Sequence, residues 1–241
     1  MIPRVIHYCW FGEAKKSKLV EHCLQSWRRV LPDYDIKEWN EYNFDISINR
    51  YCREAYECGK WAFVSDFVRL YVLYQYGGIY LDTDVEVLKP LDQFLGHAAF
   101  SGFEDREHIP TGIMGAQAGN KWIGELLAYY RDRSFVMPDG TYDTTPNVKI
   151  ITEMAKQYHG FVADNEYQII KYDVHIYPQE WFCPFSYADG KLNITKNTYT
   201  IHYFAGSWLT KTQKARIKIR RWVAKNLGDD VLNVLLKFKH R

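Results

Sequence analysis

Cysteine is scarce in this sequence, and its placement excludes the sites that cysteine usually builds. The chain has 241 residues and five cysteines, at Cys9, Cys23, Cys52, Cys58 and Cys183. The number is odd and no two of them have CxxC spacing, so we expect neither a disulfide framework nor a zinc site. Reduced thiols of this kind are typical of a cytosolic protein.

Long apolar runs are also absent. No stretch approaches the roughly 18 uninterrupted apolar residues of a membrane-spanning helix. The N-terminus lacks the basic region and apolar stretch of a signal peptide, so we expect none. Hydrophobic residues nevertheless make up 47% of the chain and charged residues 25%. This composition is typical of a globular protein with a sizeable core.

Net charge is small but unevenly distributed. The chain carries +2 at pH 7, yet seven Lys or Arg and no acid lie between Lys211 and Lys225. They are interleaved with Ile217, Ile219, Trp222, Val223 and Leu227. A basic helix with an apolar side predicts binding to an anionic membrane surface. The alternative is a solvated helix that packs its apolar side on the rest of the protein, and nothing else in the sequence favours nucleic acid.

Strand-like and helix-like patterns alternate along the chain. The predicted strands are 5–10, 34–39, 79–88, 100–103, 112–116, 167–177 and 199–204, and the predicted helices are 18–31, 60–76, 121–133, 148–158 and the last thirty residues. This alternation predicts an α/β fold with a largely parallel sheet. Ligands of such sheets bind at the carboxyl ends of the strands.

An Asp-Thr-Asp sequence follows the apolar run Ile79-Tyr80-Leu81. On a strand, Asp82 and Asp84 would project from one face. Two such carboxylates repel unless a cation lies between them, and Mn²⁺ or Mg²⁺ would satisfy them while leaving positions for phosphate oxygens. The alternative for an isolated DxD is a solvated turn. Here the pair follows an amphipathic helix, a Gly-Gly and an apolar strand, which favours the metal site.

The preceding helix carries Asp66 and Arg69 three residues apart, on one helical face. The pair is either a local ion pair or a polar corner that holds sugar hydroxyls beside the metal. The residue pattern does not decide between the two.

Three segments, in this order, resemble a known family. They are Ile2 to Gly12, then Ser65-Asp66-x-x-Arg69 with Leu73-Tyr74-x-x-Gly77-Gly78-Ile79-Tyr80-Leu81-Asp82-Thr83-Asp84, and last Ile201 to Trp208. Together they resemble the DXD-containing retaining glycosyltransferases, which include yeast initiating mannosyltransferases and bacterial capsular-polysaccharide transferases (glycosyltransferase family 32). The glucosylating clostridial toxins are more distantly similar.

The resemblance implies a GT-A fold, a Rossmann-like sheet with helices on both sides. It implies that Asp82 and Asp84 hold the metal and diphosphate, and that Asp66, Arg69 and Tyr80 bind the donor sugar. It further implies that Trp10 stacks on the nucleotide base and that His202, Ser207 and Trp208 contact the metal and phosphates. The alternative for both His202 and Trp10 is that they are residues of the hydrophobic core and have no part in the site.

The resemblance also sets the expected domains and chemistry. Residues 1–208 would form the catalytic domain and residues 209–241 a basic helical tail. The implied reaction moves a sugar from a nucleotide-sugar, with UDP as the first expectation, to a glycan or lipid-linked glycan in surface polysaccharide synthesis. No residue is evident as a nucleophile, so front-face attack with retention is expected. The enzyme would be cytoplasmic and peripheral on the inner face of the cell membrane.

The acceptor region cannot be matched to the family residue by residue. The polar segment Glu104 to Gly112 is the candidate, with Glu104, Asp105 or His108 as possible acceptor ligands.

Two other functions compete. One is a phosphohydrolase of the haloacid dehalogenase type, in which the first Asp of an Asp-x-Asp is a nucleophile. Against it, Glu86 occupies a position where a small or β-branched residue is usual. The other is a Ca²⁺-dependent glycan-binding module without enzymatic activity, although Val87 stands where an EF-hand loop needs Gly.

Overall fold

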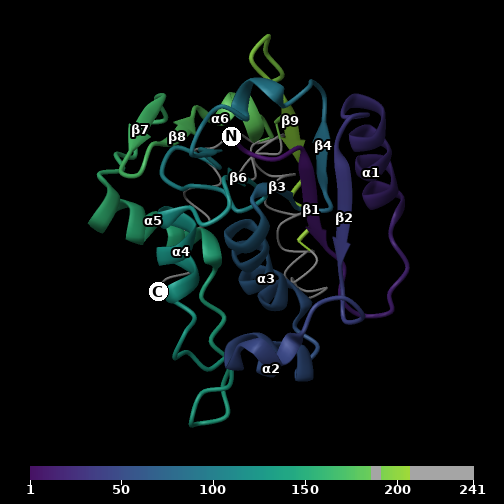
Figure 1. Ribbon diagram of the computed structural model, residues 1–241, viewed down its shortest axis with the longest axis vertical. Helices are drawn as coiled ribbons and strands as arrows, with labels where there is room; N and C mark the ends of the chain where they lie inside the picture. Colours follow the sequence, from purple (N-terminus) through teal and green to yellow (C-terminus); the bar gives the residue numbers. More distant parts are fainter. Residues whose placement is uncertain (186–190, 207–241) are drawn as a thin grey trace, which may run out of the picture.

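The computed structural model describes residues 1–185 and 191–206, which form a seven-stranded sheet, a smaller two-stranded sheet and helices on both faces of the large sheet (Figure 1). The large sheet has the order β2 (Asp35–Trp39), β1 (Val5–Cys9), β3 (Gly78–Leu81), β6 (Ile113–Ala116), β5 (Ala99–Gly102), β8 (Val174–Tyr177) and β7 (Gln168–Ile170). The sheet is mixed, because β6 runs antiparallel to both of its neighbours and β7 antiparallel to β8. The predicted α/β fold is confirmed, with the helix-covered sheet that a GT-A fold implies.

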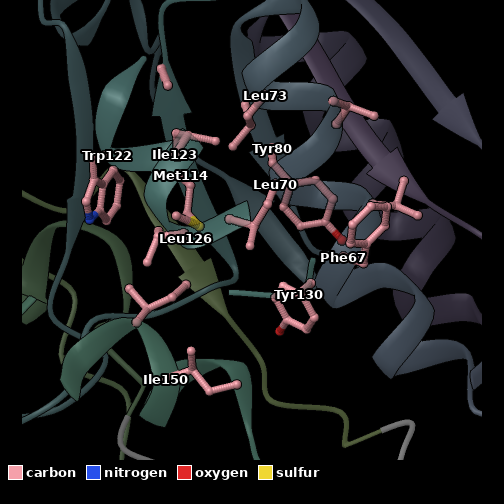
Figure 2. Close-up of a cluster of buried hydrophobic side chains, with 14 of the residues drawn as sticks. Phe67, Leu70, Leu73, Tyr80, Met114, Trp122, Ile123, Leu126, Tyr130 and Ile150 are labelled. Carbon is pink, nitrogen blue, oxygen red and sulfur yellow. The ribbon is translucent and has the colours of Figure 1, made fainter. Parts of the chain in front are cut away.

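The helices lie on opposite faces of this sheet. One layer contains α2 (Arg50–Glu57), α3 (Trp61–Tyr76), α4 (Lys121–Ala128) and α5 (Asn147–Met154), and the other contains α1 (Lys18–Val30) and the short α6 (Gln179–Phe182). Strand β3 shows the alternation between the layers. Tyr80 packs in the α3 layer with Phe67 and Leu70 (Figure 2), whereas Ile79 and Leu81 belong to the α1 layer.

Gly77 and Gly78 allow α3 to turn directly into β3. Gly77 ends the helix with φ 65°, and its N–H donates to the Leu73 carbonyl at 3.0 Å. Gly78 has φ 108°, and a Cβ there would lie 2.7 Å from the Val5 carbonyl oxygen. A side chain at Gly78 would therefore be both strained and blocked by β1. This turn fixes the start of β3, and with it the position of the Asp-Thr-Asp sequence.

The prediction of one β run from 79 to 88 is wrong at its centre. The chain forms β3, turns at Asp82 to Asp84, and continues as β4 (Val85–Val87) in the small sheet, paired with β9 (Thr200–His202). The Val85 N–H donates to the Asp82 carbonyl at 3.0 Å, which closes the turn. The two aspartates therefore do not share the face of a strand; the turn itself brings them together.

Among the described residues, no helix has the length and apolarity needed to cross a membrane. The predicted tail of residues 209–241 lies outside the described residues, as do Ser207 and Trp208.

Candidate metal and donor-sugar site

The candidate residues gather at one edge of the large sheet. Strands β1, β3 and β5 run in the same direction, because β6 is antiparallel to both β3 and β5. Their carboxyl ends therefore lie together, and each is followed by a predicted site residue: Trp10 after β1, Asp82 after β3 and Glu104 shortly after β5. This is the edge at which α/β sheets bind ligands.

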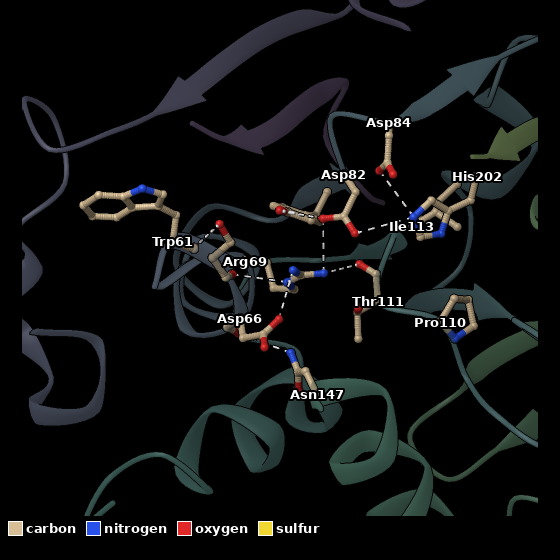
Figure 3. A network of polar contacts seen from close by, with 12 residues as sticks. Trp61, Asp66, Arg69, Asp82, Asp84, Pro110, Thr111, Ile113, Asn147 and His202 are labelled. Carbon is tan, nitrogen blue, oxygen red and sulfur yellow. Dashed lines mark hydrogen bonds and ion pairs between the residues drawn. The ribbon is translucent and has the colours of Figure 1, made fainter. Parts of the chain in front are cut away.

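Asp82, Asp84 and His202 converge at this edge (Figure 3). One ligand atom from each side chain lies within 4.8 Å of the others. His202 Nε2 is 3.3 Å from an Asp84 carboxylate oxygen and 4.0 Å from one of Asp82. The pairing of β4 with β9 places His202 opposite Val85, the residue after Asp84. Two carboxylates and an imidazole are a suitable donor set for a divalent cation.

The position of His202 depends on a glycine. A Cβ on Gly112 would lie 2.7 Å from His202 Nδ1, so only glycine leaves room for the ring there. Burial opposes the charged form of His202, but the Asp84 carboxylate outweighs it and raises the His202 pKa well above its usual value. Burial likewise opposes the charge on Asp84, yet His202 and the Ala205 N–H lower the pKa of Asp84. The two carboxylates thus favour a positive charge at this position, which a bound cation would supply in place of the His202 proton.

Arg69 is the centre of the adjoining network. Its guanidinium is 3.0 Å from an Asp66 oxygen and 3.3 Å from an Asp82 oxygen, and it donates to the Thr111 carbonyl at 2.7 Å. It also lies over the Tyr80 ring, 4.7 Å from the centroid. Tyr80 in turn donates to Asp82 at 3.0 Å. Arg69 therefore joins the predicted sugar-binding pair to the predicted metal ligand.

Asp66 is buried beside this guanidinium. Burial raises the pKa of Asp66 to about 6, although Arg69 favours its charged form. Asp66 and Arg69 do form the local ion pair, and they also lie against the metal cluster. The structure thus shows the local ion pair beside the candidate metal cluster, and sugar binding by the pair stays a prediction.

Asn147 is a site residue that the sequence did not predict. It is the first residue of α5, it is 3% exposed, and its Nδ2 donates to the Asp66 main-chain carbonyl at 3.4 Å. Its Oδ1 is buried without a hydrogen-bond partner in the described structure. A buried amide with a free acceptor is costly unless something completes it. The only sequence signal was Pro146 before a helical pattern, which marks a helix start and nothing more.

Trp10 follows β1, and its indole N–H donates to the Ala14 carbonyl at 3.0 Å. Lys16 lies over the ring at 5.3 Å from its centroid and pairs with Glu38 at 2.8 Å. The side chain is partly buried and packs against the α1 layer. Its place at the sheet edge is compatible with the predicted stacking on a base.

The acceptor candidates fall into two groups. Asp105 accepts hydrogen bonds from the Glu107 and His108 N–H groups and pairs with the His108 ring at 2.9 Å, so these exposed residues shape their own loop. Glu104 differs. Burial raises the pKa of Glu104 to about 7, although the charge of His202 acts to lower it. The charges of His202 and Asp82 both act on Glu104, which indicates that it lies near the candidate metal cluster.

A family model matches the part of the chain that carries most of the candidate site residues. Residues 17–101, from α1 through β5, match the family described as glycosyltransferase sugar-binding region containing DXD motif. This segment includes Asp66, Arg69, Asp82 and Asp84. The predicted family resemblance is thereby confirmed.

Individual proteins are similar to this chain at low sequence identity. The chain is 26% identical over 137 residues to inositol phosphoceramide mannosyltransferase 3 of Schizosaccharomyces pombe, which covers 52% of this chain and 36% of that protein. It is 23% identical over 233 residues to an uncharacterised glycosyltransferase of Acanthamoeba polyphaga mimivirus, covering 90% and 88% of the two chains. The chain thus spans about a third of the length of the yeast relative. These matches agree with the predicted class of enzyme, a glycosyltransferase.

Among solved structures, the PaToxG glycosyltransferase is similar with a TM-score of 0.49 and 17% identity, over 65% of this chain and 69% of that one.

Proposed function

We propose that this protein is a metal-dependent, retaining glycosyltransferase that moves a sugar from a nucleotide-sugar to a glycan acceptor. The observation that carries the proposal is that Arg69 contacts both Asp66 and the candidate metal ligand Asp82. The Asp82, Asp84 and His202 cluster would hold Mn²⁺ or Mg²⁺ and the diphosphate, and Arg69 joins it to the buried Asp66 that would hold the sugar. A site that binds only Ca²⁺ or only a phosphate would not need the pair of Asp66 and Arg69 beside the metal cluster.

The residues of the chain act mainly by positioning and by neutralising charge. A divalent cation, when bound, stabilises the negative charge that develops on the departing diphosphate. Arg69 adds a fixed positive charge beside it and holds Asp82 in place through their 3.3 Å contact. Asp66 and Asn147 offer a carboxylate and a free amide oxygen to sugar hydroxyls. Preorganised groups of this kind lower the barrier without reorganising during the reaction.

Retention by front-face attack is supported by the state of the carboxylates. Asp66 is engaged by Arg69, Asp82 by Arg69 and Tyr80, and Asp84 by His202 and the Ala205 N–H. Asp82 and Asp84 would be occupied by the metal and Asp66 by Arg69, so none of these three carboxylates would be free to attack the sugar carbon. The acceptor hydroxyl would then attack from the side of the leaving phosphate, whose oxygen accepts the proton.

The donor and acceptor are part of the proposal. UDP-sugars are the first donors to test, with GDP-mannose next, because the yeast relative bears the name of a mannosyltransferase. The same name specifies a lipid, inositol phosphoceramide, which supports a lipid-linked glycan as acceptor. We place the protein in the cytoplasm, on the inner face of the cell membrane, in surface polysaccharide synthesis; the basic tail supports this location.

A thermal-shift screen of nucleotide-sugars with Mn²⁺ tests the proposal, because a ligand that binds only the folded state raises the melting temperature. One nucleotide-sugar should raise it more than its free nucleotide diphosphate does, and only with Mn²⁺ or Mg²⁺ present. The phosphohydrolase alternative instead predicts release of phosphate from simple phosphoesters. Sugar binding without nucleotide binding would favour the Ca²⁺-dependent module.

A further inference from the structure

A surface groove begins one residue from Asn147. It has a volume of about 460 Å³, and its lining includes Arg133, Met137, Tyr142, Thr144, Pro146 and Lys149. Pro146 precedes Asn147, whose amide contacts Asp66. The Asp143 carbonyl accepts from Tyr51, whose ring packs on Tyr130 at 5.0 Å. The groove therefore adjoins the polar corner proposed to hold the donor sugar.

The lining of the groove combines an apolar surface with positive charge. Tyr142 is 43% exposed and Met137 42% exposed. One face of Tyr142 is stacked on Phe135 at 5.2 Å between ring centroids, which fixes the ring while leaving part of it exposed. Lys60 lies 5.5 Å from the centre of the same ring. Exposed, fixed aromatic rings beside polar groups are typical of surfaces that bind sugar rings.

The acids around the groove are already engaged. Asp143 pairs with Arg133 at 2.8 Å, Glu54 pairs with Arg50 at 2.6 Å, and Asp139 accepts hydrogen bonds from Thr141 in its own turn. Lys149 is exposed on α5, and the Arg133 side chain is 41% exposed while its guanidinium is fixed over Tyr129. Because Arg133 and Asp143 neutralise each other, the exposed ammonium of Lys149 is the charge that the groove presents to an incoming ligand.

We infer that this groove is the acceptor subsite, and that it takes a saccharide carrying a carboxylate or phosphate. The inference rests on the proposed function, since it places the acceptor next to the donor sugar. Tyr142 and Met137 would contact the sugar ring, and Lys149 and Arg133 would contact the anionic group. An acceptor held there approaches the corner of Asp66 and Asn147 from the α5 side.

The inference is tested by ligand-observed NMR titration of the full chain with UDP and the diamagnetic ion Mg²⁺ present. The probes are methyl β-D-glucuronide, its neutral counterpart methyl β-D-glucoside, glucose 6-phosphate and inorganic phosphate. Because exposed charge pairs contribute modestly, the charged sugars should bind about threefold to fivefold more tightly than the glucoside. Inorganic phosphate alone should bind more weakly than glucose 6-phosphate, since it makes no contact with Tyr142.

Matched variants locate the binding site. Lys149→Gln should remove most of the preference for charged sugars, whereas Lys156→Gln, an exposed lysine farther along the same segment, should leave it unchanged. Tyr142→Ala should weaken binding of all three sugars, in contrast to Tyr158→Ala, which removes a comparably exposed ring outside the groove. Equal effects within either pair of variants would overturn the inference.

Two further outcomes would also overturn it. One is equal or absent binding of the charged and neutral sugars, and the other is equal binding of inorganic phosphate and glucose 6-phosphate, which would indicate a plain anion site. Donor hydrolysis with Mn²⁺, measured without acceptor in the unsubstituted chain and in Lys156→Gln, tests the proposed function separately. Hydrolysis without a charged-sugar preference contradicts only the acceptor subsite.

Discussion

Arg69 decides how the residues of the site act together. It is 4% exposed and contacts both Asp66 and Asp82, so these two carboxylates are the charged partners of its buried guanidinium. A buried charge without a partner is strongly destabilising. The metal cluster and the sugar corner are therefore one structural unit at this residue.

Substitutions in the sugar corner should separate sugar binding from nucleotide binding. We expect Asp66→Asn and Arg69→Ala to weaken affinity for the nucleotide-sugar about tenfold or more, because each removes a charged hydrogen-bond partner. Affinity for the free nucleotide diphosphate should fall less. Isothermal titration with both ligands measures the difference, with Arg53→Ala, an exposed residue of α2, as control. Equal losses for both ligands, or none, would show that the pair is only structural.

The pKa of Asp66 predicts how this variant changes stability with pH. Burial raises the pKa of Asp66 to about 6 from an ordinary value of 3.8, so the folded protein binds this proton more tightly than the unfolded chain. The stability due to Asp66 is therefore fully present below pH 4 and is lost as pH rises to 6. Asn does not titrate. The free energy of unfolding of Asp66→Asn, relative to the original chain, should rise by about 2–3 kcal/mol from pH 4 to pH 6 and then level off.

Urea denaturation of both proteins across this range is the measurement. A difference that stays constant with pH would show that Asp66 titrates normally in the folded protein.

At the scale of elements, the turn from α3 into β3 positions the whole site. Gly78→Ala should destabilise the protein by about 2–3 kcal/mol or more, because it adds a contact with the Val5 carbonyl to an unfavourable φ. Gly119→Ala is the matched control: its φ is also positive, at 69°, but no atom lies within 4 Å of the added Cβ. It should cost about 1 kcal/mol. Similar denaturation midpoints for the two variants would contradict this account.

Long periodic elements could be predicted from the sequence, whereas irregular ones could not. Helix α3 was predicted nearly to its ends, because its apolar spacing and Gly77-Gly78 are local signals. Helix α2 was not predicted, since its few buried residues, Tyr51, Cys52 and Ala55, are too short a pattern. The predicted strand 167–177 is two strands, β7 and β8, separated by Tyr172 and Asp173 at positive φ. Two non-glycine residues in that conformation give no signal in the sequence.

The candidate site, too, could be predicted from the sequence only where the signal is local. Asp82 and Asp84 were predicted from local pattern, and their convergence with His202, 118 residues beyond Asp84, came from the family resemblance. Asn147 could not be predicted because a single Asn at a helix start is common, and only the packing of α5 on α3 gives it a partner in Asp66. Long-range placement of polar residues leaves no periodic trace in a single sequence.

At the scale of the whole molecule, the predicted basic tail would place the site at a membrane. We expect the full chain to co-sediment with phosphatidylglycerol vesicles at low salt and to dissociate as salt rises, because each cation near the surface contributes about 1 kcal/mol. Replacing Lys218, Arg220 and Arg221 by Gln should weaken binding, while replacing Lys15, Lys16 and Lys18 should not. Equal binding by both triple variants, or no binding by the original chain, would show that the tail is not an anchor.

The central claim is that Asp82, Asp84 and His202 hold a metal on which sugar transfer depends. The most direct measurement is the rate of nucleotide release from the nucleotide-sugar selected by the thermal-shift screen, with Mn²⁺ and with EDTA. The account predicts that release requires the metal and falls about 100-fold or more in Asp82→Asn and Asp84→Asn. It should be unchanged in Asp92→Asn, whose carboxylate pairs with Arg4 on the surface. Undiminished release in EDTA, or in both site variants, would contradict it.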